Sequence, residues 1–113
     1  MKHKNTATVD CSALIENYHT IERLAAPAEV ICVVKADAYG HGIEAVSEAL
    51  GAAGCGFFAV SSEEEAAQLR LLEQAHRRHP RILILGHIDP DNVGAMLEND
   101  IICTVVSAEN GRL

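Results

Sequence analysis

Four apolar runs divide the chain at nearly regular intervals. They begin near residues 30, 57, 82 and 101, and each is continuous rather than alternating with polar residues. Continuous apolar runs of this length are typical of strands covered on both faces, as in a parallel sheet. The first run, Val30–Val34, therefore predicts a fully buried strand.

Amphipathic segments separate these runs and predict helices. Asp10 or Ser12 can cap the first helix, and a second helix covers about residues 43–53. Ser62 and Glu65 have the spacing of a capping box at the start of a third helix. The run Glu63–Glu65 also places negative charge at the positive end of that helix dipole. For a fourth helix we expect an inner face made of Val93, Met96 and Leu97.

The alternation of strands and helices places the chain in the α/β class with a parallel sheet. Its 113 residues suffice for one domain, and no linker or internal repeat interrupts them. A doubly wound sheet and a (β/α)8 barrel both have this order of elements. The pattern alone leaves these two architectures open.

The strongest candidate for a reactive residue is Lys35, which comes directly after the first apolar run. Burial disfavours a charged ammonium, and the uncharged amine is the form that attacks a carbonyl group. Barrel enzymes carry their catalytic residues at the carboxyl ends of their strands, which is where Lys35 would lie. Taken alone, a lysine at a strand end is more often a surface residue whose aliphatic stem is covered.

The ten residues Val33–Gly42 resemble the pyridoxal-phosphate signature of alanine racemases. The residues that follow Lys35 carry the most specific part of this likeness, the sequence Tyr-Gly-His-Gly. Further similarities to the family extend along the chain. They include Phe58–Val60, Glu64–Ala66, Leu69–Arg70 and Ile82–Gly86.

The resemblance implies parallel (β/α) units that form roughly the first half of a (β/α)8 TIM-type barrel. Residues 1–113 would be the N-terminal part of the cofactor-binding barrel domain. The rest of the barrel and the C-terminal β domain of the family would lie outside this chain. So would the arginine beside the pyridine nitrogen and the tyrosine base that a partner subunit contributes, since the family works as a homodimer.

The resemblance also implies roles for individual residues. Lys35 would bind pyridoxal phosphate as a Schiff base and would be one of two bases that move the α-proton of alanine. The hydroxyl of Tyr39 would contact the cofactor phosphate, and Val33 and Leu85 would touch the ring. For His41 we expect a structural hydrogen bond. The implied reaction interconverts L- and D-alanine and supplies D-alanine for peptidoglycan.

Other functions remain open at this point. One is a serine or broad-specificity amino-acid racemase, because much of the substrate selection in the family lies outside these residues. A second is a protein that binds pyridoxal phosphate without turnover. A third is an inactive fragment, whose open sheet edges would invite pairing with another chain.

Charge and composition narrow the class of partner. A formal net charge of −7 argues against nucleic acid or an anionic membrane as the main partner. No apolar stretch approaches the roughly 20 residues of a membrane span, and the polar N-terminus predicts a cytoplasmic protein. The four cysteines are far apart in the sequence and predict reduced thiols. His76 and His79 have a spacing that can bind a metal, but no third ligand stands near them.

Overall fold

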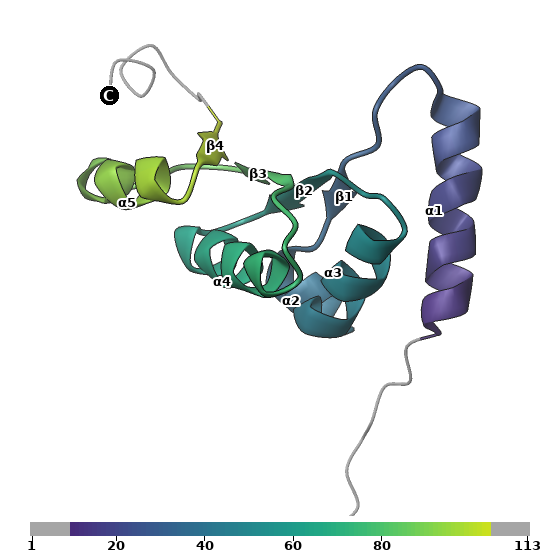
Figure 1. Ribbon diagram of the computed structural model, residues 1–113. Helices are drawn as coiled ribbons and strands as arrows, with labels where there is room; N and C mark the ends of the chain where they lie inside the picture. The colour runs from purple at the N-terminus through teal and green to yellow at the C-terminus, as the bar shows by residue number, and fades with distance from the viewer. Residues whose placement is uncertain (1–9, 105–113) are drawn as a thin grey trace, which may run out of the picture.

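The computed structural model describes residues 10–104, which form four parallel strands and the helices around them (Figure 1). In chain order the elements are α1 (Cys11–Ala25), β1 (Cys32–Val33), α2 (Lys35–Tyr39), α3 (Ile43–Ala52), β2 (Phe57–Val60), α4 (Glu63–Ala75), β3 (Arg81–Ile84), the 3-10 turn η1 (Pro90–Asn92), α5 (Val93–Glu98) and β4 (Ile101–Cys103).

The strands are arranged in the order β1-β2-β3-β4, and each is parallel to its neighbours. Each strand thus pairs with the next strand in the chain. A doubly wound sheet reverses its strand order at a switch point, whereas a barrel adds strands in sequence. Within the described residues, the order is that of consecutive barrel strands.

The hydrophobic core lies between the sheet and the helices on one side of it (Figure 1). Phe58 and Val60 of β2 are completely buried there, as are Ile82 and Ile84 of β3. Side chains of α3 and α4 pack against them, and Leu69 of α4 is also completely buried. The apolar runs of the sequence therefore supply the strand side of this core.

The opposite face of the sheet is only partly covered by the residues that the structure describes. Val33 is 38% exposed and Ile102 is 39% exposed, and both lie on this face because they align with Ala59 and Leu83. Ile31, just before β1, is 42% exposed. The prediction of a fully buried first strand is therefore wrong. The helices of this segment cover one face, and the other face is the one that would line the inside of a barrel.

The helix caps agree with the sequence prediction more closely than the helix faces do. Asp10 accepts a hydrogen bond from the backbone N–H of Ala13 at 3.0 Å, and Ser62 accepts one from that of Glu65 at 3.1 Å. In α5, however, Leu97 is 76% exposed, although we expected it to face inward. Each residue turns the helix by about 100°, so Leu97 cannot share the face of the buried Met96 beside it.

The structure also tests what composition led us to expect about disulfides, metal binding and membrane spans. All four cysteines are free thiols, and Cys55 is buried. His79 contacts the carboxylate of Asp100 at 3.0 Å. Residues 10–104 contain no cluster of three or more side chains that could hold a metal ion. Among the same residues, no helix is long and apolar enough to cross a bilayer.

Candidate active site

The carboxyl ends of the parallel strands meet at one edge of the sheet, and the predicted site residues lie there. The N–H of Val34 donates to the carbonyl of Ala59 at 2.8 Å, and the N–H of Leu85 donates to that of Val60 at 2.8 Å. The hydrogen bonding between strands thus continues one residue past β1 and β3. Lys35 comes directly after this last bond of β1, so it lies at the same edge as Leu85.

Lys35 and Tyr39 share this edge. The Nζ atom of Lys35 lies 6.0 Å from the centre of the Tyr39 ring, at the outer limit of a cation–π contact. Tyr39 is 59% exposed, and among the described residues its hydroxyl has no hydrogen-bond partner. The structure therefore places the amine of Lys35 and the phenol of Tyr39 at the same edge of the sheet.

Val33 and Leu85 add an apolar surface beside them. Val33 aligns with Ala59, which aligns with Leu83, and side chains two residues apart share a face of a strand. Leu85 comes two residues after Leu83 and so belongs to the same face as Val33. Val33 and Leu85 are 38% and 39% exposed, which leaves both side chains available for contact.

The segment after Lys35 has an unusual backbone. Although α2 is a short helix, Ala36, Asp37 and Ala38 have φ values of +53° to +54°, and Tyr39 has +58°. Gly40 follows at +85°. The segment is therefore a left-handed turn, a conformation that costs L-residues roughly 1–2 kcal/mol each. We expected only a tight turn shaped by glycines, and the four left-handed residues before Gly40 were not foreseen.

Hydrogen bonds at its far end hold this turn. The carbonyl of Asp37 accepts from the N–H of Gly42 at 2.9 Å, and its Oδ1 atom accepts from the N–H of Ile43 at 2.8 Å. Asp37 thus caps α3 from outside the helix. The Nδ1 of His41 lies 3.0 Å from the carbonyl oxygen of Ala38, which can only accept, so the ring donates. The expected structural hydrogen bond of His41 is confirmed.

Glu65 holds the near end of the turn. Its Oε2 atom accepts a hydrogen bond from the N–H of Ala36 at 2.6 Å. Its Oε1 atom accepts from the N–H of Ser61 at 2.8 Å and from the Ser61 hydroxyl at 2.7 Å. Burial favours a higher pKa for Glu65, but the hydrogen bonds from Ser61, Ala36 and Asp37 outweigh it and lower that pKa below its ordinary value.

This contact goes beyond what the sequence indicated for Glu65. Only one side of the predicted capping box forms, the bond from the Glu65 N–H to Ser62. The carboxylate leaves the helix and reaches Ala36, 29 positions earlier. A contact across that separation leaves no signal in local spacing, so sequence reasoning named Glu65 but missed its bond to Ala36. It also missed the capping role of Asp37.

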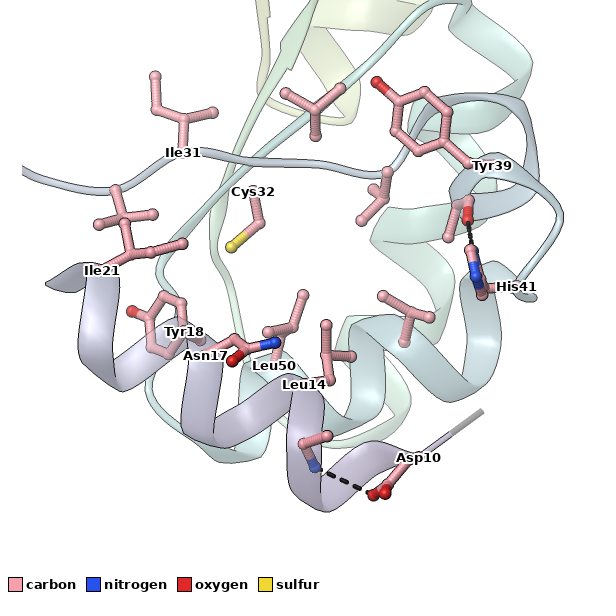
Figure 2. A pocket seen from close by; sticks show the side chains of 16 residues that line it. Asp10, Leu14, Asn17, Tyr18, Ile21, Ile31, Cys32, Tyr39, His41 and Leu50 are labelled. Carbon is pink, nitrogen blue, oxygen red and sulfur yellow. Dashed lines mark hydrogen bonds between the residues drawn. The ribbon is translucent and has the colours of Figure 1, made fainter. Parts of the chain in front are cut away.

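A cavity of about 530 Å³ adjoins the site, between α1 and the segment from β1 to α3 (Figure 2). Leu14 and Tyr18 line it from α1, and Cys32 lines it from β1. Val33 and Tyr39 also contribute to its wall, but Lys35 and Leu85 do not. The cavity is thus next to the candidate site, and the amine of Lys35 lies outside it.

Comparison with known proteins places this half-barrel in a family. Residues 9–113 match the family model "Alanine racemase, N-terminal domain". The chain is 38% identical to an alanine racemase of Methanococcus maripaludis over 110 residues, which is 96% of this chain and 28% of the relative. The chain therefore spans less than a third of the length of that relative.

Solved structures agree. The biosynthetic alanine racemase of Pseudomonas aeruginosa superposes with a TM-score of 0.82 at 35% identity, over 92% of this chain and 28% of that one. The alanine racemase of Bartonella henselae with covalently bound pyridoxal phosphate gives 0.76 at 34% identity, over 84% and 27%. A histidine racemase of Leuconostoc mesenteroides gives 0.79 at 26% identity, over 90% and 26%. The match to the family model over residues 9–113 and these likenesses show that the chain belongs to the alanine racemase N-terminal domain family.

Proposed function

We propose that this chain supplies the pyridoxal-phosphate-binding half-barrel of an alanine racemase, with Lys35 as the residue that binds the cofactor. The observation that carries the proposal is that the Nζ atom of Lys35 lies 6.0 Å from the centre of the Tyr39 ring at the carboxyl edge of the sheet. Lys35 directly precedes the left-handed turn that follows β1, and Tyr39 is the last of its four non-glycine residues with positive φ.

The chemistry of the side chains at this edge fits pyridoxal phosphate. A primary amine combines with the aldehyde of the cofactor, and a phenol O–H donates to a phosphate oxygen. The half-exposed Val33 and Leu85 offer an apolar surface to a flat ring. The Bartonella henselae racemase, which holds this cofactor covalently, has the same fold over 84% of this chain.

The mechanism assigns proton transfer to Lys35. Pyridoxal phosphate, when bound, acts as an electron sink that makes the α-proton of an attached amino acid acidic. The Nζ atom of Lys35 then accepts that proton on one face and returns it there. The Tyr39 hydroxyl would hold the cofactor phosphate by donating a hydrogen bond to it. Inversion needs a second base on the opposite face, and in the family that the sequence resembles a tyrosine of the partner subunit serves as that base.

The chain covers only 28% of the alanine racemase of Methanococcus maripaludis. Features that depend on a whole racemase are therefore part of the same proposal. They are a homodimer, an alanine substrate, a cytoplasmic location and a supply of D-alanine for peptidoglycan. The partners expected from the net charge of −7 are small molecules rather than nucleic acids or membranes.

A racemase for a different amino acid, such as serine, or one of broad specificity is the second candidate. The likeness to a histidine racemase favours it, because the same half-barrel matches proteins that act on different amino acids. The described half of the fold therefore provides the cofactor-binding lysine without selecting the substrate side chain.

The distribution of lysines in the chain allows a sharp test of cofactor binding. Lys35 is one of three lysines, and the others, Lys2 and Lys4, are close to the N-terminus. The chain is mixed with pyridoxal phosphate, reduced with borohydride and mapped by peptide mass. The double variant K2R/K4R should keep the label, and K35R should lose it. Label confined to Lys2 and Lys4 in the unaltered chain would overturn the proposal.

Proton exchange then separates catalysis from mere binding. Removing and returning a proton on one face needs only Lys35, and by the family resemblance that face is the one of the D isomer, so D-alanine should acquire α-deuterium in D2O without inversion. Nuclear magnetic resonance measures this exchange for D-alanine, D-serine and D-histidine, and the fastest substrate identifies the preferred side chain. A labelled Lys35 with no exchange on any of them would favour a cofactor-binding protein without turnover.

A further inference from the structure

The structure assigns to Glu65 the positioning of Lys35 and Tyr39, through the backbone N–H of Ala36. This inference deepens the proposed function and rests on it, because it concerns the lysine that binds the cofactor. Glu65 is not expected to touch substrate or cofactor. It acts through the peptide group that follows Lys35 directly.

The left-handed turn is held by hydrogen bonds inside it and by one bond from outside. Inside the turn, the N–H of Ala38 donates to Val34 at 3.0 Å and the N–H of Gly40 donates to Ala36 at 3.0 Å. The N–H of Ala36 has no such acceptor within the turn. It donates to the Oε2 atom of Glu65 at 2.6 Å, a short bond of the kind that a charged acceptor makes.

The bond between Ala36 and Glu65 fixes the start of the turn. Ala36 is the first of four consecutive non-glycine residues with positive φ, so its bond to Glu65 marks where the chain leaves the strand direction. Lys35 precedes this point and Tyr39 ends the run, which makes their separation depend on the turn. Strained backbone of this kind persists only where the surrounding structure holds it.

The second oxygen of the Glu65 carboxylate binds the residue that follows β2. The Oε1 atom of Glu65 accepts hydrogen bonds from both the N–H and the hydroxyl of Ser61, the residue directly after β2. One side chain therefore ties the carboxyl end of β2 to the turn after β1. The position of the Lys35 amine is thereby set relative to the sheet edge rather than left to the loop.

Neighbouring residues supply two matched controls. Glu64 precedes Glu65 in the first turn of α4 and is exposed, and its side chain makes no hydrogen bond or ion pair with any of residues 10–104. E64Q therefore removes the same charge without touching the turn. S62A removes the helix cap that accepts from the Glu65 N–H, and so weakens α4 while leaving the carboxylate in place.

The first experiment reads the contact directly in the unaltered chain. An ¹⁵N–¹H correlation spectrum is followed from pH 7 to pH 3 at the amides of Ala36 and Ser61. Because both donate to one carboxylate, both amides should shift with one midpoint, and E65Q should abolish that shift whereas E64Q should keep it. Amides that shift with different midpoints, or that do not shift, would overturn the assignment. This titration needs no variant, so it decides even when E65Q does not fold.

The second experiment reads the consequence for the lysine. The rate at which pyridoxal phosphate and borohydride label Lys35 should fall about tenfold in E65Q, the scale of one lost charge-assisted hydrogen bond. E64Q and S62A should label at the rate of the unaltered chain. Equal rates in E65Q and the unaltered chain would overturn the positioning role alone. An equal loss in S62A would also overturn it, since general weakening of α4 would then explain the effect. An unaltered chain with no label on Lys35 would instead overturn the proposed function, and this inference with it.

Discussion

The guanidinium of Arg70 donates a hydrogen bond to the backbone carbonyl of Asp100, 30 positions away, at 3.0 Å. The same group donates to the carbonyls of Asn99 at 2.9 Å and Pro80 at 2.6 Å, and the side chain is 1% exposed. Pro80 directly precedes β3, and Asp100, with a φ of +55°, directly precedes β4. Arg70 therefore fixes the amino-terminal edge of the sheet, opposite the edge that carries Lys35.

We expect R70M to destabilise the fold by about 3 kcal/mol, because it removes the donor of one buried hydrogen bond, to Pro80, and of two part-buried ones, to Asn99 and Asp100, at roughly 1–3 kcal/mol each. Urea unfolding followed by circular dichroism measures the change. R23M is the matched control, since Arg23 is exposed and donates only to the Thr20 side chain among the described residues. A loss in R70M no larger than in R23M would contradict the structural role of Arg70.

The left-handed turn leads to a prediction in which glycine stabilises the chain. Ala36 has a φ of +53°, so A36G removes the steric cost of that conformation and should stabilise by about 0.5–1 kcal/mol after the entropy cost of glycine. Ala45 is an exposed residue inside the right-handed helix α3, and A45G should destabilise by roughly the same amount. Thermal unfolding of the two variants should therefore shift in opposite directions.

Much of the fold could be predicted because it depends on local patterns. The order of strands and helices follows from apolar runs and from caps such as Asp10 and Ser62, which act within three residues of their partners. The family signature after Lys35 likewise pointed to the edge of the sheet where the structure places that residue. The choice between a barrel and a doubly wound sheet needed the strand pairing itself, which the apolar pattern does not contain.

The parts that could not be predicted depend on distant partners. The bond from Ala36 to Glu65 joins residues 29 positions apart, and neither residue type indicates it. Alanine at positive φ is also contrary to its intrinsic preference, so propensity alone predicts a different backbone there. The exposure of Val33 could not be predicted for a different reason. An apolar side chain on a strand face does not reveal whether this chain or another segment covers it.

The proposed phosphate contact of Tyr39 predicts a change in cofactor affinity without a change in stability. Y39F removes one hydroxyl from a 59% exposed ring, so unfolding should be unaffected. The dissociation constant for pyridoxal phosphate should rise about tenfold, or about 1.4 kcal/mol, for the lost hydrogen bond. Absorbance titration measures it. Tyr18 is the only other tyrosine, and Y18F should leave the affinity unchanged; an equal effect of both variants would argue against the contact.

Tyr18 itself predicts an alkaline loss of stability. Its ring is 7% exposed, and burial, followed by nearby Cys55 and Glu22, raises the pKa of Tyr18 to about 12 from an ordinary value near 10. Between pH 10 and 12 the unfolded chain releases this proton while the folded chain keeps it. The free energy of unfolding must therefore fall across that window as pH rises. Y18F lacks the group, so its urea midpoint should fall less than that of the unaltered chain over the same range, and other alkaline groups cancel in the difference. Identical falls in the two proteins would show that the folded environment of Tyr18 does not disfavour its ionised form.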